Sequence, residues 1–337
     1  MKIVNDEKFI KGVEGLIKPM EVSHLLFYQT FKRLLPSWIS KRFLLGASKK
    51  TPYIGFVIEP YSLFLFFKLK DIERAKSFLP DRYELAKTRL FADEEPDYYY
   101  GIGNLSTRAS TFWGVRQESY LIATDKETGL LSWIFIDILS NTIISLPTKG
   151  IADPNSKQAI FTTSAKKEIF LDIKEDKSDR QLSLAGTIGN GKIRKLEESI
   201  WLMGNTSIAH CKKLAGRDDT PFAVIFDPAE VTEALDIPVS DINITKNTLF
   251  PGLAEPEPCK AICFPFAQHY IADSPGCHTF VKDRDNLITL YNELSEQKQM
   301  RTFSVKAISK LFVIGIAIST AVSLLLFIYF VMHFFGS

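Results

Sequence analysis

The sequence lacks the features that most directly assign a function. Its formal net charge is only +2 over 337 residues, so composition gives no argument for a nucleic-acid partner. It has no repeat at a fixed period and no low-complexity tract. Neither the HExxH motif of zinc proteases nor the Gly-x-Ser-x-Gly motif of hydrolases occurs. Hydrophobic residues make up 46% of the chain, enough for a sizeable core, so wholesale disorder is excluded.

Charge is also absent from one long stretch near the end of the chain. Leu311–Phe335 contains no Lys, Arg, Asp or Glu. A helix rises about 1.5 Å per residue, so this segment is long enough to cross a hydrocarbon core of about 30 Å. The alternative is a buried helix of a soluble core. The next most apolar run, Tyr61–Leu69, is too short to span and is expected to be a buried strand.

The residues that flank this segment predict its orientation. Arg301, Lys306 and Lys310 precede it, and only Gly336 and Ser337 follow it. The positive-inside rule places the basic side in the cytosol. The first 20 residues lack the continuous apolar region of a signal peptide. We therefore expect a single-pass, tail-anchored membrane protein with its N-terminal domain in the cytoplasm and the lipid bilayer as a partner. The four cysteines should be reduced there, which argues against a disulfide framework.

The composition predicts that the chain is divided into three regions. Residues 301–337 form the membrane anchor, and 51–300 form a cytosolic α+β domain. Residues 1–50 hold ten Lys/Arg against four Asp/Glu and include a basic amphipathic helix over His24–Leu45, kinked at Pro36. This helix either lies in the lipid headgroup layer or packs on the domain with a solvated basic face.

The central region is rich in short strands with few helices between them. Its spacing favours a mostly antiparallel sheet curled around a cavity over a doubly wound parallel sheet. One short helix is predicted over Asp71–Leu79, capped by Asp71 and stopped by Pro80. The GNG sequence at Gly189–Gly191 predicts a hairpin. The predicted strands are Tyr53–Ile58, Ser62–Lys70, Arg82–Phe91, Tyr98–Leu105, Arg116–Thr124, Leu131–Ile138, Ala159–Thr163, Glu168–Glu175, Gln181–Gly186 and Lys192–Ile193.

The last third of the soluble region is less regular. We expect a strand over Ala223–Phe226, a short helix over Pro228–Leu235 and a helix over Asp283–Arg301. Between the two helices the chain is rich in proline and is expected to be irregular.

Several short motifs resemble a known superfamily. They are FLPDRYEL (Phe78–Leu85), GVRQESYLIA (Gly114–Ala123), GLLSWIFIDILSNT (Gly129–Thr142) and SLPTKG (Ser145–Gly150). Their order and character resemble the acetoacetate decarboxylase superfamily, over about residues 62–150. The resemblance implies a cone-like antiparallel sheet that encloses a small apolar ligand site.

The chain departs from that superfamily at its catalytic turn. The decarboxylases form a Schiff base on a lysine of a Pro-Lys-Lys turn, whereas this chain has Pro147-Thr148-Lys149. The Arg-Glu pair that the superfamily resemblance implies shortly before this turn is also missing. These departures argue against Schiff-base acetoacetate decarboxylation. Two roles for Lys149 stay open. If it is buried, it can act as an amine nucleophile; otherwise it is a solvated lysine on a turn.

Arg116, Glu118 and Asp137 are the other candidate catalytic residues. Arg116 and Glu118 alternate on one predicted strand, so their side chains share a face. On an inward face they form a charged pair that fixes a polar ligand group, and Asp137 is expected to join them. On an outward face they are an ordinary surface pair.

A metal site is the remaining candidate. Cys259, Cys263, His269, Cys277 and His278 lie within twenty residues, and zinc or an iron–sulfur cluster accepts such ligands. Their spacing matches no recognised motif, and the alternative is a set of buried cysteines with incidental histidines. No other cofactor is expected.

Taken together, the sequence predicts a membrane-tethered domain that binds, and as an enzyme also transforms, a small apolar or lipid-like metabolite. An enzyme of this kind would be a lyase or a related activity. The alternative is a non-enzymatic, membrane-tethered interaction domain with a protein partner, stabilised by the Cys/His site.

Overall fold

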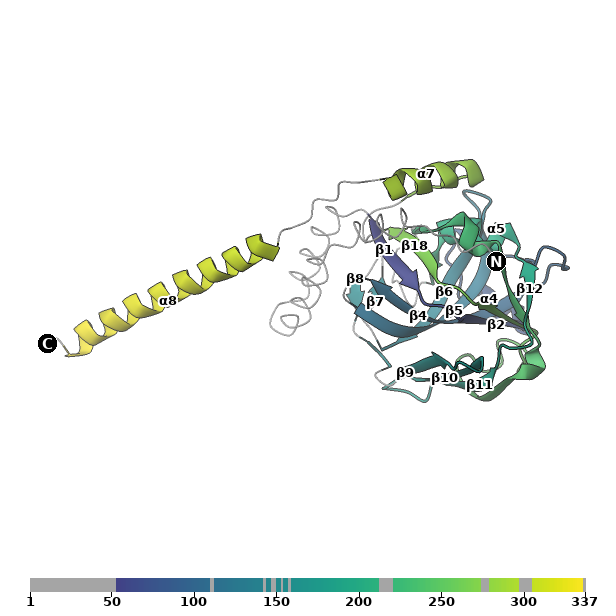
Figure 1. Cartoon of the computed structure of the whole chain (residues 1–337), viewed down its shortest axis with the longest axis horizontal. Helices are drawn as coiled ribbons and strands as arrows, with labels where there is room; N and C mark the ends of the chain where they lie inside the picture. The colour runs from purple at the N-terminus through teal and green to yellow at the C-terminus, as the bar shows by residue number, and fades with distance from the viewer. Residues whose placement is uncertain are drawn as a thin grey trace.

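The computed structural model describes residues 53–109, 112–141, 144–146, 150–152, 154–156, 159–211, 221–273, 279–296 and 305–335. Strands dominate the part before residue 280 (Figure 1). They are β1 (Tyr53–Ile58), β2 (Ser62–Lys68), β3 (Tyr83–Leu85), β4 (Tyr99–Ala109), β5 (Phe112–Asp125), β6 (Leu131–Ser140), β7 (Ile144–Leu146), β8 (Gly150–Ala152), β9 (Ala159–Thr163), β10 (Glu168–Lys174), β11 (Gln181–Thr187), β12 (Lys192–Lys195), β13 (Ala209–His210), β14 (Val224–Phe226), β15 (Glu233–Ile237), β16 (Ile242–Asn247), β17 (Lys260–Phe264) and β18 (Gln268–Asp273).

Helices are short within this part and longer after it. The described helices are α4 (Ile72–Lys76), α5 (Glu198–Trp201), α7 (Arg284–Glu296) and α8 (Val305–Phe335), with 3-10 turns η1 (Met203–Ser207), η2 (Pro228–Val231) and η3 (Val239–Asp241). Asp71 caps α4 by accepting a 2.9 Å hydrogen bond from the backbone of Arg74, as its sequence predicts. Asp283 likewise accepts from the backbone of Asn286 at the start of α7.

The main sheet has 12 strands and branches at β4. One path runs β12-β15-β17-β2-β4-β1-β18-β14, and β5 and β6 continue from the other edge of β4. Pairing is antiparallel apart from β13, which runs parallel to β6. The described strands do not close into a barrel. The predicted class, a mostly antiparallel α+β fold, is confirmed.

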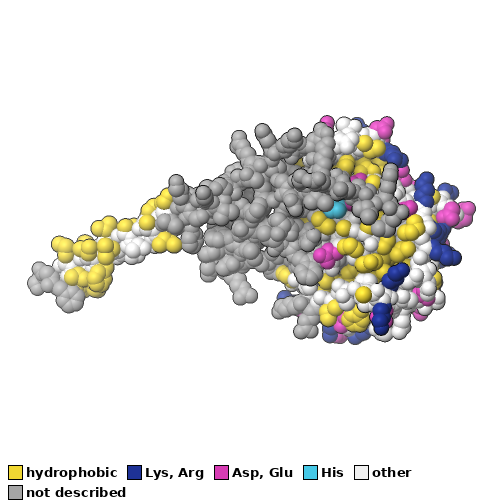
Figure 2. Space-filling view, in the orientation of Figure 1, with side chains coloured by type: hydrophobic (Ala, Val, Ile, Leu, Met, Phe, Trp, Pro, Cys, Tyr) yellow, Lys and Arg dark blue, Asp and Glu magenta, His cyan; other side chains and the backbone are white. Residues whose placement is uncertain are grey.

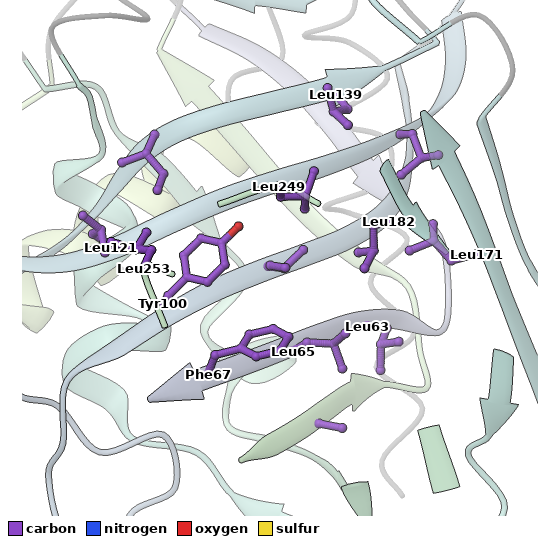
Figure 3. Close-up of a cluster of buried hydrophobic side chains, with 14 of the residues drawn as sticks. Leu63, Leu65, Phe67, Tyr100, Leu121, Leu139, Leu171, Leu182, Leu249 and Leu253 are labelled. Atoms are coloured by element: carbon purple, nitrogen blue, oxygen red, sulfur yellow. The ribbon is translucent and has the colours of Figure 1, made fainter. Parts of the chain in front are cut away.

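A second sheet, in the order β16-β11-β10-β9, packs on one face of the main sheet. The hydrophobic cluster between them joins side chains of β2, β4, β5 and β6 to those of β10 and β11. Figure 3 shows this layer, in which Leu63 and Tyr100 of the main sheet belong to the same cluster as Leu171 and Leu182 of the second sheet. This sandwich buries one face of β5.

The opposite face of the main sheet curls around a second hydrophobic cluster, which we call the inner core. Its members come from both branches of the sheet: Phe64 and Phe66 of β2 and Val224 and Phe226 of β14 from the long path, and Tyr120, Ile122, Trp133 and Phe135 from β5 and β6. Trp133 and Trp201 donate their ring N–H groups to the carbonyls of Ile200 and Leu90, both at 2.9 Å. The inner core is therefore dominated by aromatic rings with satisfied polar atoms.

Glycine permits one close approach within this core. A Cβ built on Gly103 of β4 would lie 2.7 Å from the Phe64 ring and 3.1 Å from the Tyr120 ring. The two rings can therefore pack over the strand only because residue 103 has no side chain.

Three sequence predictions about this region are wrong. Gly189–Gly191 does not join a hairpin, because β11 pairs with β10 and β16 while β12 pairs with β15. The only described glycines with positive φ are Gly129 and Gly252, so the GNG segment lacks the backbone of a two-residue hairpin turn.

The second wrong prediction is the helix over Pro228–Leu235, where only the 3-10 turn η2 forms before the chain enters β15. The third is the irregular proline-rich stretch, which contains β16, β17 and β18. The described prolines of this stretch lie in the segments between the strands, where they remove no hydrogen bond from the sheet.

Helix α8 is 31 residues long, and its segment Ile314–Phe334 is long and apolar enough to cross a membrane by length and composition. None of that segment is buried within the protein. Figure 2 shows its yellow hydrophobic side chains open to the surroundings. The alternative of a buried core helix therefore does not describe α8. Residues 1–50 lie outside the described residues, and the predicted region boundaries remain predictions.

Candidate functional site

Strand β5 carries a polar group of side chains into the inner core. Successive residues of a strand point to opposite faces, and Ile122 and Tyr120 belong to the inner core. Glu118 and Arg116 continue the same row. On the other face, Ser119 accepts or donates a 2.9 Å hydrogen bond with Tyr100, which belongs to the layer between the sheets.

The three polar residues of this row contact one another. The Arg116 Nη2 atom lies 2.7 Å from Glu118 Oε1, and Tyr120 donates its hydroxyl hydrogen bond to Glu118 Oε2. The side chains of Arg116 and Glu118 are 13% and 9% exposed. The structure therefore places Arg116 and Glu118 on the inward face, mostly removed from water.

Burial and charge set the protonation of this group. Burial opposes the charge of Arg116, but the neighbouring Glu118 carboxylate prevails and raises the arginine pKa. Burial, and then the charge of Glu118, raise the pKa of Tyr120 well above its usual range. Burial also raises the pKa of Tyr270, against a smaller opposing effect of Arg116. The site therefore holds one ion pair and neutral tyrosines at neutral pH.

The site also holds hydrogen-bonding atoms that the described residues leave unused. Arg116 Nε is buried and donates no hydrogen bond within the described part of the chain. The hydroxyl of Thr107 on β4 is in the same situation. Thr107 lies two residues beyond Leu105, which is paired with Arg116 and belongs to the inner core. Both atoms thus lie toward the same end of the inner core.

Aromatic rings surround this polar end. Tyr120 packs on Phe135, with ring centroids 4.8 Å apart. His210 stacks with Phe135 at 5.2 Å and with Phe222 at 5.4 Å. Tyr270 packs on rings from two further strands, Phe56 of β1 and Phe226 of β14, each at 5.1 Å. Flat aromatic rings and a single charged pair therefore lie together at this end of the inner core.

Comparison with known proteins gives a structural likeness and no match in sequence. No family model matches the chain, and no curated protein matches it. Among solved structures it is similar to acetoacetate decarboxylase from Legionella pneumophila. The two are 10% identical, the alignment covers 68% of this chain and 89% of that chain, and the TM-score is 0.38.

Asp137 does not join Arg116 and Glu118. It pairs with Arg180, which follows β10, and both side chains are mostly shielded from water. The register between β5 and β6 shifts after Ser119, so Ser119 lies opposite Asp137 while Tyr120 lies opposite Phe135. Asp137 thus shares the face of Ser119, toward the second sheet. A β-bulge of this kind adds one residue and reverses the alternation that the sequence pattern assumes.

Lys149 lies outside the described residues. The strands on either side of it are described: β7 and β8 pair with each other, and β7 begins four residues after the end of β6. The end of β6, Ser140, is paired with Arg116. The role of Lys149 remains a prediction.

The candidate metal ligands are dispersed where they are described. Cys263 is fully buried on the face toward the second sheet, and burial raises the pKa of its thiol to about 12. Cys259 packs against the inner core, on the other face, and its thiol lies 3.3 Å from the carbonyl of Phe66. His269 Nδ1 lies 2.7 Å from Glu230 Oε1. No group of three metal-binding side chains occurs among the described residues. Cys277 and His278 lie outside them, so the metal prediction stays open.

Sequence reasoning missed Tyr120, Tyr270 and His210 as part of this site. Tyr120 could have been predicted from the sequence, because it continues the alternation of Arg116 and Glu118 along the strand. Tyr270 and His210 come from strands far along the chain, and they reach the site through the pairing of β18 with β1 and of β13 with β6.

Proposed function

We propose that α8 anchors this protein in a lipid bilayer and that the sheet domain binds a small apolar or lipid-like metabolite beside the membrane. The observation that carries the binding proposal is the buried Arg116–Glu118 pair at the end of the aromatic inner core. Its guanidinium keeps a buried N–H group without a partner in the described part of the chain. A bound molecule with a hydrogen-bond acceptor would supply that partner.

A purely structural role explains this arrangement less well. Removing two charges from water is costly, and apolar residues of similar volume often stabilise a core equally well or better. A buried polar group also costs free energy unless its hydrogen bonds are made. The pair therefore contributes little to stability, and a role in recognition agrees with the general clustering of perturbed ionisable groups at functional sites.

The membrane part of the proposal rests on α8. Its large apolar side chains are exposed, for example Leu325 at 66% and Met332 at 71%. Exposed apolar surface on this scale is unfavourable in water and favourable in lipid. The basic residues before the apolar segment support a cytoplasmic position for the sheet domain. A membrane anchor would also concentrate a lipophilic ligand near the domain.

The binding proposal is tested by native mass spectrometry of the full chain, solubilised from membranes in detergent. We expect a small organic molecule to remain bound to the wild-type protein and to be lost from Arg116→Met. The matched control is Arg82→Met, because Arg82 is also 13% exposed and pairs with buried Asp125 at 2.6 Å, away from the inner core. Loss of the molecule from both variants, or its absence from the wild type, would count against the site.

A second candidate function is a membrane-tethered interaction domain without a ligand. The observation in its favour is a pair of exposed apolar side chains on the outer face of the second sheet, Ile160 at 51% and Phe170 at 45%. Their strands β9 and β10 are paired, and Ile160 lies diagonal to Phe170 in that register. Cross-linking in membranes that depends on Phe170 and not on Arg116 would favour this function.

A further inference from the structure

We infer that the polar group of the ligand is an uncharged hydrogen-bond acceptor, such as the carbonyl of a ketone, an aldehyde or an ester, and not a carboxylate or phosphate. The inference rests on the proposed function and names the ligand class of the same site. It follows from which hydrogen-bonding atoms are occupied and from the balance of charge around Arg116.

The carboxylate of Glu118 is already engaged at both oxygens. Oε1 is paired with Arg116 at 2.7 Å, and Oε2 accepts from Tyr120. The unpartnered groups in the described part of the site are the buried N–H of Arg116 and the hydroxyl of Thr107. Both can donate a hydrogen bond. The guanidinium N–H can only donate, so the ligand group that pairs with it must be an acceptor.

The charge of Arg116 is also already balanced. Its main electrostatic neighbours are Glu118, Tyr270 and Tyr120, and the two tyrosines are neutral at ordinary pH. The Arg116–Glu118 pair thus has a net charge of zero. A carboxylate beside Arg116 would add a second negative charge close to Glu118 in a mostly dry environment, where like charges repel strongly. A neutral carbonyl accepts the same hydrogen bond without that repulsion.

The rest of the ligand should be apolar. The rings of Phe135, Phe222 and Tyr270 lie around the polar end, and each belongs to or packs on the inner core. An alkyl or terpenoid chain with one carbonyl group matches this combination of ring surfaces and a single donor site.

The test compares three probes that share an alkyl chain: methyl dodecanoate, dodecanoate at pH 8, and dodecane. Binding of each to the full chain in nanodiscs of zwitterionic lipid is measured by tryptophan fluorescence, since Trp133 lies in the inner core. We expect the ester to bind at least tenfold more tightly than the carboxylate and the alkane. In Arg116→Met the ester should lose its advantage over dodecane, which controls for partitioning into lipid.

Glu118→Gln sharpens the test because it removes the balancing charge and keeps an acceptor for Tyr120. In this variant the order should reverse, and dodecanoate should bind more tightly than the ester. Tighter binding of dodecanoate to the wild type, dependent on Arg116, would overturn the inference and leave the proposed function standing. Equal binding of ester and dodecane would also overturn it. Failure of all three probes to bind the wild type would contradict the proposed function itself.

Discussion

The coupling between Arg116 and Glu118 makes the strongest prediction about this molecule. Replacing either residue alone leaves one mostly buried charge without its partner. Glu118→Gln keeps an acceptor for the Tyr120 hydroxyl but removes the negative charge, and Arg116→Met removes the positive charge. The double variant Arg116→Met/Glu118→Gln removes both charges and keeps the hydrogen bond from Tyr120.

The expected magnitudes follow from burial. Breaking a buried ion pair costs about 3–5 kcal/mol. Because the Arg116 side chain keeps 13% exposure, we expect the lower end, about 3 kcal/mol for each single variant. In a domain of about 150–250 residues, a loss of about 3 kcal/mol lowers Tm by roughly 6–12 °C. The double variant carries no unpaired charge and should lie within about 1 kcal/mol of the wild type.

The assay is thermal unfolding of the four full-chain proteins in the same detergent, followed by tryptophan fluorescence. Reversible urea unfolding gives the coupling free energy from the same set of variants. Single variants that each cost less than about 0.5 kcal/mol would show that the pair is solvated. A double variant as unstable as the two single losses combined would show that the residues act independently. Either result would refute the description of this site as a buried, mutually neutralised pair.

Three further predictions concern other parts of the chain. Gly186→Ala should unfold at a markedly lower urea concentration than the wild type, because the added Cβ would lie too close to the backbone carbonyl oxygen of Asp241. The control is Gly129→Ala, whose added Cβ would have no atom within 4 Å, so it should lose only the stability that its positive φ costs. Burial opposes the ionisation of Asp125, but hydrogen bonds, led by the one from Arg82, prevail and lower its pKa. The stabilisation by ionised Asp125 is therefore present above about pH 4, the pKa in the unfolded chain, and is lost as the pH falls through the lower pKa of the folded protein. Between pH 5 and pH 3 the wild type should therefore lose more unfolding free energy than Asp125→Asn, and parallel curves would contradict this. Leu325→Arg in α8 should cost about 3–4 kcal/mol of membrane insertion and increase the fraction released by alkaline carbonate, whereas Leu325→Ala should remain in the membrane fraction.

The sequence predicted much of the fold because local patterns decide it. β1 and β9 begin and end at the predicted residues, and the first strands of both sheets were recognised from their β-branched and aromatic content. The class of sheet followed from the number and spacing of strands. The strands between the prolines were not predicted because they are short. The frequent prolines were taken to exclude strands from the whole region, whereas they exclude them only locally.

The site was less predictable, for a physical reason. Alternation along β5 placed Arg116 and Glu118 on one face, but no local signal shows which face of a buried strand is inside. The bulge in β6 adds one residue between Phe135 and Asp137, and this reverses the face on which Asp137 lies. Tyr270 reaches the site through pairing of β18 with β1, a contact between segments far apart in sequence. Such information exists only in the assembled sheet.

The position of β5 between two cores has a mechanical consequence. Glu118 and Tyr120 face the inner core, and Ser119 between them contacts Tyr100 in the layer beneath the second sheet. A backbone cannot rotate one residue of a strand without displacing its neighbours. A molecule that shifts Glu118 would therefore also shift Ser119, and the displacement would reach the strands that pack on Tyr100. Occupancy of the proposed site would thereby be transmitted through β5 to the buried layer beneath the second sheet.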